Sequence, residues 1–343
     1  MITIDGSYGE GGGQVLRTAL ALSCITNKAV HITNIRKGRH KPGLLQQHLT
    51  CVKAAKKITQ AKVKGDEFRS QELLFEPAEI ESGKYFFNVA EERGSAGAVT
   101  LVLQTILPIL IRANESSSVS ISGGTHTKWS PPVHYTQKVL QSTLKSLGLD
   151  VSVALKKWGF YPIGKGEIEV KIESTDQIKD INLAERGSLQ CLSGISVVAG
   201  LPLSIAERQK REVKRNLKDW TPEIEVLEVS TASKGTFVFL LAEFENLVAG
   251  FSALGEPGKL AEKVADEACD DFLYYYNSGQ AIEHWLADQI ILFLALAKEK
   301  SVFTTSKISQ HLLTNIWVIK KFLDANIEIA GELDKPGKVQ INI

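Results

Sequence analysis

Residues 16–58 read LRTALALSCITNKAVHITNIRKGRHKPGLLQQHLTCVKAAKKI. This stretch predicts an apolar helix over 16–25, a short alternating strand over 29–33, a polar loop through Arg39, and an amphipathic helix over 43–58. The same order of elements recurs twice further along the chain. The second copy predicts elements over 99–112, 118–121 and 131–147, and the third over 285–297, 301–304 and 309–325. We therefore expect an α+β fold of three repeated sheet-and-helix units with pseudo-threefold symmetry.

The interval between the second and third copies is longer than that between the first and second, which indicates an insertion. The extra residues, 185–278, predict strands over 190–199, 223–229 and 236–241, a helix over 202–217, and a closing helix over 257–275 with Pro257 in its first turn. We expect a main domain split into residues 1–184 and 279–343, with a smaller α/β domain inserted at 185–278. The length of 343 residues fits two such units better than one core.

The composition is that of an ordinary folded protein, with 43% hydrophobic and 23% charged residues. The longest apolar run, 290–297, is far shorter than a membrane span, and the opening residues do not resemble a signal peptide. We expect a cytoplasmic protein without membrane contact.

The four cysteines form no zinc-binding pattern and are expected to be reduced core thiols. Because the net charge is only +1, any nucleic-acid contact must be local.

Two loops of the first unit could bind an anion. The glycine loop, residues 9–13, reads GEGGG between a strand and a helix, where backbone N–H groups can face a phosphate. Its Glu10 would repel that phosphate unless it held a magnesium ion; the alternative is a sharp turn with an exposed carboxylate. The cation loop, residues 36–42, reads RKGRHKP and can converge on phosphate or simply be solvated. Arg17 stands alone on an apolar helix, where a buried guanidinium needs an anionic partner.

Two other features have less specific signals. Residues 159–165 match Gly-x4-Gly-Lys, but residues 167–172 alternate as a strand, so we reject a Walker nucleotide site in favour of a hairpin. The helix over 202–217 and the residue after it place four cations on one face, which could contact an RNA backbone; a solvated face is the commoner explanation. Those four are Arg208, Arg211, Arg215 and Lys218.

A histidine near the C-terminus could be a nucleophile. If Ser309 caps the helix over 309–325, His311 lies in its first turn, where the helix dipole favours a neutral imidazole. A neutral imidazole can attack phosphorus and form a labile phosphoramidate. On these residues alone, a structural role for His311 also stays open.

Nine short motifs, in order along the chain, carry a family resemblance. They are GEGGGQVLR (9–17), RKGR (36–39), KPGL (41–44), QHL (47–49), GSAG (94–97), LQT (103–105), SGGT (122–125), LADQ (286–289) and HLLTN (311–315). Each motif is unspecific, but their joint order resembles the RNA 3′-terminal phosphate cyclase family over essentially the whole chain. One departure is that relatives have three glycines near 164–166 and a basic residue in place of Trp158.

The resemblance implies an enolpyruvyl-transferase/cyclase-like fold, whose insert resembles the C-terminal domain of translation initiation factor three. It implies that His311 attacks the α-phosphorus of ATP, releases pyrophosphate and carries covalent AMP. The AMP would pass to an RNA 3′-phosphate, and the neighbouring 2′-hydroxyl would displace it to close a 2′,3′-cyclic phosphate. The protein would act as a monomer or homodimer.

The resemblance also implies roles for individual residues. Glu10 would bind Mg²⁺ or Mn²⁺, and Pro131 or Pro132 would lie against the adenine. The ATP would be surrounded by Gln104, Trp285, Leu286, Ala287, Asp288 and Gln289. The phosphates or the RNA end would be bound by Arg17, Arg36, Arg39, Gln47 and His48.

Two alternatives stay open. The family includes a non-catalytic branch that works in ribosome assembly and lacks the nucleophilic histidine, so the presence of His311 argues against it. The enolpyruvyl transferases share the repeated fold but act on small anionic metabolites without a covalent nucleotide. They predict no dependence on ATP.

Overall fold

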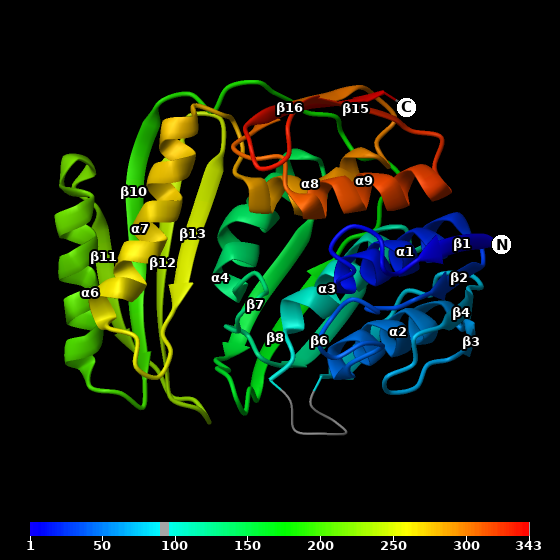
Figure 1. Cartoon of the computed structure of the whole chain (residues 1–343), viewed down its shortest axis with the longest axis horizontal. Helices are drawn as coiled ribbons and strands as arrows, with labels where there is room; N and C mark the ends of the chain where they lie inside the picture. Colours follow the sequence, from blue (N-terminus) through cyan, green and yellow to red (C-terminus); the bar gives the residue numbers. More distant parts are fainter. Residues whose placement is uncertain (90–95, 343) are drawn as a thin grey trace.

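The computed structural model describes residues 1–89 and 96–342 (Figure 1). The first unit consists of β1 (Ile2–Asp5), α1 (Gly13–Thr26), β2 (Val30–Thr33), α2 (Gln46–Thr59), β3 (Lys62–Lys64) and β4 (Leu73–Glu76). The second consists of β5 (Lys84–Asn88), α3 (Val99–Ile111), β6 (Ser117–Gly123), α4 (Val133–Tyr135), a π-helical segment (Thr136–Leu140), α5 (Gln141–Ser146), β7 (Val151–Lys157) and β8 (Gly166–Ile172). The third consists of β9 (Asn182–Leu183), α8 (His284–Leu294), β14 (Ser301–Thr305), α9 (Gln310–Phe322), β15 (Asn326–Gly331) and β16 (Gly337–Asn342).

The three units have sheets of the same topology. Their strand orders are β1-β2-β4-β3, β5-β6-β8-β7 and β9-β14-β16-β15. In each sheet the first pair is parallel and the next two pairs are antiparallel. The repeated sheet-and-helix pattern expected from the sequence is thus matched by strand order, while the threefold axis stays a prediction. The β7–β8 pair is the expected hairpin, not a phosphate-binding strand and helix.

A fourth sheet is formed by residues between β9 and α8. It contains β10 (Leu189–Ala199), β11 (Glu223–Glu228), β12 (Gly235–Phe244) and β13 (Val248–Leu254) in the order β11-β10-β12-β13. Helices α6 (Leu203–Asn216) and α7 (Ala261–Ser278) cover one of its faces and share a separate hydrophobic core with it (Figure 1). We call this part the insert; its boundaries at 185 and 278 stay a prediction.

Three points of the sequence analysis need correction for the insert: the start of its closing helix, its number of strands, and the burial of Cys191. The closing helix begins at Ala261 and not at Pro257, because Gly258 has φ +83°, which interrupts a right-handed helix. Strand β13 was not expected. Cys191 is exposed on β10, whereas Cys24, Cys51 and Cys269 are buried as predicted.

The basic face of α6 forms ion pairs within the insert. Arg208 donates two hydrogen bonds to Glu262 of α7, at 2.8 and 2.6 Å. Arg215 pairs with the buried carboxylate of Glu212. Two of the four cations thus have carboxylate partners, and the choice between a solvated face and an RNA contact stays a prediction.

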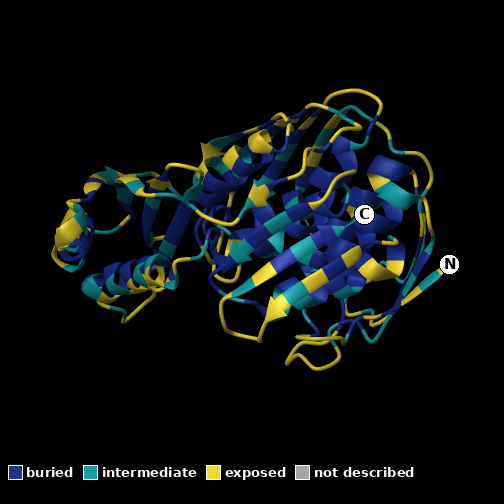
Figure 2. Cartoon of the chain, turned by 90° about the horizontal axis from the view of Figure 1, so that it is seen from above, coloured by how far each residue is buried: buried dark blue, intermediate teal, exposed yellow. Residues whose placement is uncertain are grey.

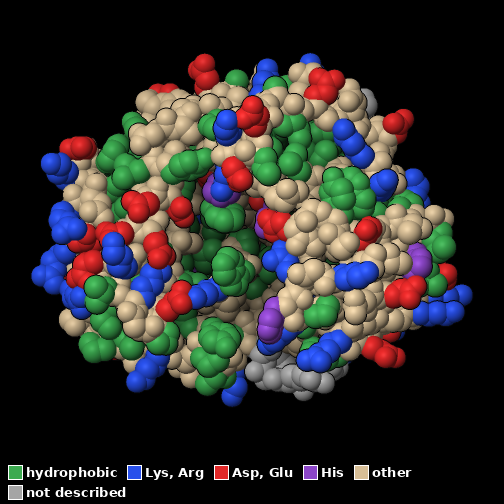
Figure 3. Space-filling model, viewed as in Figure 1, with side chains coloured by type: hydrophobic (Ala, Val, Ile, Leu, Met, Phe, Trp, Pro, Cys, Tyr) green, Lys and Arg blue, Asp and Glu red, His purple; other side chains and the backbone are tan. Residues whose placement is uncertain are grey.

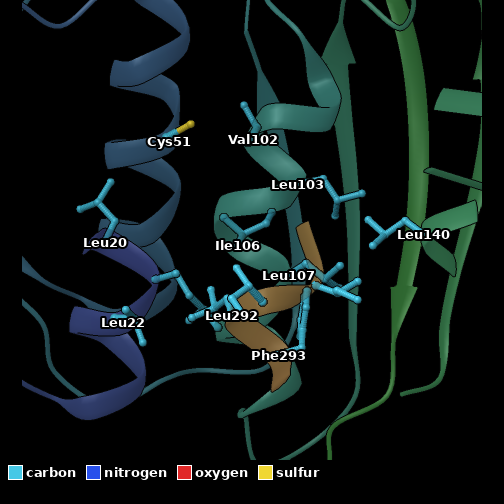
Figure 4. Packing of buried hydrophobic residues seen from close by; sticks show 14 of the residues in the cluster. Leu20, Leu22, Cys51, Val102, Leu103, Ile106, Leu107, Leu140, Leu292 and Phe293 are labelled. Atoms are coloured by element: carbon cyan, nitrogen blue, oxygen red, sulfur yellow. The ribbon is translucent and has the colours of Figure 1, made fainter. Parts of the chain in front are cut away.

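The helices of the three units pack on one another. Helix α1 contacts α2, α3 and α9, and α8 contacts α9 and α3. Figure 4 shows the side chains of this core, among them Leu20, Cys51, Val102, Ile106 and Phe293. In Figure 2 the buried residues fill the interior and the exposed ones follow the loops and outer faces. The helices of the three units therefore share one hydrophobic core. Among the described residues, no helix has the length and apolar character needed to span a membrane.

Candidate active site

A cavity of about 1120 Å³ is lined by all three units and by the insert. Figure 3 shows the hollow between the insert and the rest of the molecule, with hydrophobic side chains in its depth and charged side chains and histidines around it. The predicted site residues that line it are Glu10, Arg17, Arg36, Arg39, Gln47, His48, Gln104, Pro131, Trp285, Asp288, Gln289 and His311. Pro132 lines it as well.

Two of the predicted nucleotide contacts lie elsewhere. Leu286 and Ala287 are fully buried in the hydrophobic core. The helical period explains this, because on α8 the side chains of Trp285, Asp288 and Gln289 share the face toward the cavity while those between them point inward. Gly94 and Ser95 of the GSAG motif lie outside the described residues.

The start of α9 presents His311 to the cavity. Ser309 is the N-cap as predicted, since its hydroxyl accepts a hydrogen bond from the Leu312 N–H at 2.9 Å. The same hydroxyl donates to the Asp288 carboxylate of α8. Burial lowers the pKa of His311, a shift that nearby Glu10 opposes and Arg17 and Arg39 reinforce. The imidazole is therefore neutral at pH 7, as a nucleophile requires.

Asp288 ties α8 to α9. Its backbone oxygen accepts a hydrogen bond from the Asn315 side chain at 2.8 Å, in addition to the contact of its carboxylate with Ser309. Burial raises the pKa of the Asp288 carboxyl to about 7, although the Ser309 hydroxyl lowers it. The contacts of Asp288 thus fix the helix start that carries the imidazole.

The glycine loop docks on the same helix. The Tyr8 ring stacks on Trp317 of α9, with ring centroids 3.9 Å apart. Gly9 has φ +62°, and a Cβ there would lie 2.5 Å from the Thr314 hydroxyl, so both backbone and space require glycine. As a result Glu10 lies between two units, 3.2 Å from Nδ1 of His311 and 3.3 Å from a guanidinium nitrogen of Arg39.

Hydrogen bonds from α1 reinforce this docking. The Gln14 amide donates to the Asn315 side-chain oxygen at 2.8 Å, and the Thr18 hydroxyl donates to the same oxygen at 2.7 Å. The Gln14 oxygen in turn accepts from Arg17 at 2.6 Å. Gln14 and Asn315 lie within the GEGGGQVLR and HLLTN motifs, but the sequence offers no signal that the two side chains would pair.

Arg17 and Arg36 line the cavity without an ion-pair partner among residues 1–89 and 96–342. Arg17 is only 8% exposed and Arg36 is half-buried, and in the described part of the chain the Nε of each has no hydrogen-bond partner. Burial lowers the pKa of both guanidinium groups, and no carboxylate among the described residues opposes that shift. Burial, together with these two cations, lowers the pKa of His48 to about 3, so that imidazole stays neutral. A buried, unpaired guanidinium is costly, and an anionic ligand would offset that cost.

The opposite wall comes from α3, α8 and the loop before α4. The Gln104 amide donates to the Gln289 oxygen at 2.9 Å, and the Gln289 amide donates to the Trp285 carbonyl at 3.0 Å. The Trp285 side chain is 47% exposed beside them. This wall offers an aromatic surface and amide groups, which suit a nucleobase more than a phosphate.

The buried contact between Glu283 and Tyr135, next to this wall, was not expected from the sequence. Glu283 caps α8 by accepting hydrogen bonds from the N–H groups of Trp285 and Leu286, and it accepts another from the Tyr135 hydroxyl. Burial raises the pKa of the Glu283 carboxyl to about 8, although these partners lower it. The available signal was a carboxylate directly before an apolar helix, which is a usual N-cap position.

A family model described as RNA 3′-terminal phosphate cyclase matches residues 8–329. The chain belongs to the RNA 3′-terminal phosphate cyclase family. It is 43% identical over 346 residues to the RNA 3′-terminal phosphate cyclase of Gloeothece citriformis (strain PCC 7424), which covers 98% of this chain and 99% of the relative. The cyclase of Sulfurisphaera tokodaii (strain DSM 16993 / JCM 10545 / NBRC 100140 / 7) is 44% identical, with 97% of each chain covered.

A third relative is somewhat less similar in sequence. The RNA 3′-terminal phosphate cyclase of Pyrococcus abyssi (strain GE5 / Orsay) is 40% identical, over 99% of this chain and 98% of the relative. Among solved structures, the enolpyruvyl transferase NikO from Streptomyces tendae matches with a TM-score of 0.30 and 7% identity, covering 99% of this chain and 65% of that chain. A similarity that low supports no conclusion about function.

The family match confirms the resemblance drawn from the nine motifs. The similarity over nearly the whole chain to relatives that are named as cyclases identifies this chain as an enzyme. Among the described residues, no group of three or more His, Cys, Asp or Glu side chains is arranged to hold a metal ion. A cyclase that uses Glu10 for a metal would therefore need other ligands, such as substrate phosphates.

Proposed function

We propose that this chain converts an RNA 3′-phosphate to a 2′,3′-cyclic phosphodiester, using ATP and a covalent AMP on His311. The observation that carries this proposal is a neutral imidazole at a capped helix start. It faces a cavity lined by Arg17 and Arg36, whose Nε atoms have no hydrogen-bond partner among the described residues. A carboxylate next to Nδ1 favours the proton on that nitrogen, which leaves the Nε2 lone pair free to attack.

In the first step the Nε2–phosphorus bond forms and the bond to pyrophosphate breaks. Arg17, Arg36 and Arg39 bind the triphosphate and stabilise the charge that develops on it. Gln104, Trp285 and Gln289 hold the adenosine, with Pro131 or Pro132 against the base. An RNA 3′-phosphate oxygen then takes the AMP from His311. Finally the 2′-hydroxyl attacks the 3′-phosphorus, gives its proton to solvent, and AMP leaves.

Glu10 is the residue that would hold a divalent cation, and its two carboxylate oxygens lie 3.2 Å from His311 and 3.3 Å from Arg39. Mg²⁺ is commonly bound by one or two carboxylates and substrate phosphates, and Glu10 supplies one carboxylate at the phosphate end of the cavity. Mg²⁺ or Mn²⁺ held there would offset the charge of the triphosphate. Gln47 and His48 line the same cavity and would then remain for the RNA end.

Labelled ATP tests this proposal. Incubation with α-labelled ATP and Mg²⁺ should give labelled protein, whereas γ-labelled ATP should not. The label should resist alkali and be lost in acid, as expected for a phosphoramidate. RNA with a 3′-phosphate should discharge it, and RNA with a 3′-hydroxyl should not. An enolpyruvyl transferase or a non-catalytic relative would take no label, and that result would overturn the proposal.

Replacing Ser309 with Ala should slow labelling roughly tenfold and lower the free energy of unfolding by about 1 kcal/mol. The variant loses the hydroxyl that caps α9 and binds Asp288, so the helix start is less well fixed. Ser309→Thr keeps a capping hydroxyl and serves as the control. Labelling rates and denaturant unfolding measure both effects; an alanine variant as fast as the threonine variant would contradict this role.

A further inference from the structure

Trp129 is exposed to an unusual degree. The residue is 95% exposed, although tryptophan has one of the largest apolar side-chain surfaces of any residue. Its backbone has φ +62°, in the left-handed region that bulky side chains rarely adopt. Such strain persists only when the surroundings impose it, and it is concentrated at functional sites.

The surrounding turn holds Trp129 in this position. The hydroxyls of Thr127 and Ser130 lie 2.9 Å apart, and Ser130 also donates to the Thr127 carbonyl at 2.9 Å. Pro131 and Pro132 follow and restrict the backbone further. Lys128, which directly precedes Trp129, forms an ion pair with Glu256 of the insert. The exposed ring is therefore presented by a fixed turn that contacts both parts of the molecule.

Trp129 lines the cavity that holds the candidate active site. Residues of the insert, among them Phe237 and Leu254, line the same cavity. Its volume of about 1120 Å³ exceeds the roughly 300–1000 Å³ usual for a small-molecule pocket. A cavity of this volume leaves space beside a single bound nucleotide.

We propose that Trp129 stacks on a nucleobase near the 3′ end of the RNA and so forms an RNA subsite at this cavity. The inference rests on the proposed function. Proteins that bind single-stranded RNA commonly pair cationic groups for the backbone with aromatic rings for the bases. Here Arg17, Arg36 and Arg39 supply cationic groups for phosphates in the same cavity, and Trp129, a residue that is 95% exposed, supplies an aromatic ring.

The adenine of ATP is a less suitable partner for Trp129. Trp285 already offers an aromatic surface beside the amides of Gln104 and Gln289. The reaction brings two nucleotides together, and the cavity wall carries two exposed tryptophans. We assign Trp285 to ATP and Trp129 to RNA.

Separate measurement of the two half-reactions tests this assignment. Trp129→Ala should lower kcat/KM for AMP transfer from the labelled protein to 3′-phosphorylated RNA by roughly 5- to 150-fold, the range for loss of one stacked base. Labelling by ATP should change less than twofold. Trp129→Phe should recover most of the loss and Trp129→Leu little of it. Phe86→Ala is the matched control, because Phe86 is exposed on β5 and does not line the cavity.

An abasic scan identifies the base. In RNAs that lack one base at a time from the 3′ end, wild type and Trp129→Ala should transfer AMP at equal rates when the missing base is the one that stacks. The proposal would be overturned if Trp129→Ala transferred AMP more slowly than wild type to every RNA, whichever base is missing. So would an alanine variant equal to wild type, or one in which labelling by ATP falls as much as transfer to RNA. Failure of the wild type to take label would instead reject the proposed function.

Trp129→Gly separates binding from folding. Glycine adopts the left-handed conformation freely, so its thermal midpoint should equal or exceed that of wild type. Its affinity for a fluorescent 3′-phosphorylated RNA should fall as for Trp129→Ala. A large drop in thermal midpoint with unchanged RNA affinity would mean that Trp129 serves the fold and would overturn the proposal.

Discussion

Replacing His311 with Asn removes the covalent label from α-labelled ATP, with the rate expected to fall by at least about a thousandfold. The amide is similar in size to imidazole and can still donate a hydrogen bond to Glu10, but it has no nucleophilic nitrogen. Ser309 still caps the helix, so α9 is expected to keep its start. The rate of label incorporation under single-turnover conditions measures the effect.

His31→Asn is the control for this substitution. His31 bonds Glu72 at 2.6 Å on the first sheet and does not line the cavity. This variant should take label at the wild-type rate. Full labelling of His311→Asn would mean that another residue carries the AMP, and the proposed mechanism would be wrong.

Replacing Gly13 with Ala should slow labelling about 100-fold, because misplacement of catalytic groups by about 1 Å has effects of that size. A Cβ at Gly13 would lie 2.5 Å from Nε2 of His48 and 2.8 Å from a guanidinium nitrogen of Arg17. Both side chains would have to move within the phosphate end of the cavity. The labelling rate and its dependence on ATP concentration measure the effect.

Gly38→Ala is the matched control, since a Cβ at Gly38 would meet no atom within 4 Å. It lies in the cation loop, so it tests whether any added methyl group near the arginines is harmful. Both variants should keep the thermal midpoint of wild type within a few degrees. A Gly13→Ala enzyme that takes label within twofold of the wild-type rate would refute the claim of close packing.

The fold could be predicted from the sequence where periodic patterns are long. Helices α1, α3 and α9 begin and end within a few residues of their predicted limits, because each has a continuous apolar face. Strand β13 was missed because its residues, VAGFSAL, include a glycine and small side chains that read as a loop. The start of α7 was misplaced because Pro257 is a usual first helical residue, whereas the backbone of Gly258 decides the boundary.

The candidate site could be predicted residue by residue but not as a network. The motifs indicated His311, Glu10 and the arginines, since each lies in a local pattern. The hydrogen bond between Gln104 and Gln289 joins residues 185 positions apart, and no local pattern reports such a pair. Leu286 and Ala287 were included because they lie within a motif, although the period of α8 turns them into the core.

The contact between Gln14 and Asn315 spans 301 positions of the chain. During translation, the glycine loop leaves the ribosome among the first residues, while its partner helix emerges near the end of synthesis. On the proposed mechanism, a chain that ends before His311 lacks the imidazole that would react with ATP. If His311 carries the AMP, the reactive centre therefore needs nearly the whole chain, and chains that end before α9 should take no label from ATP.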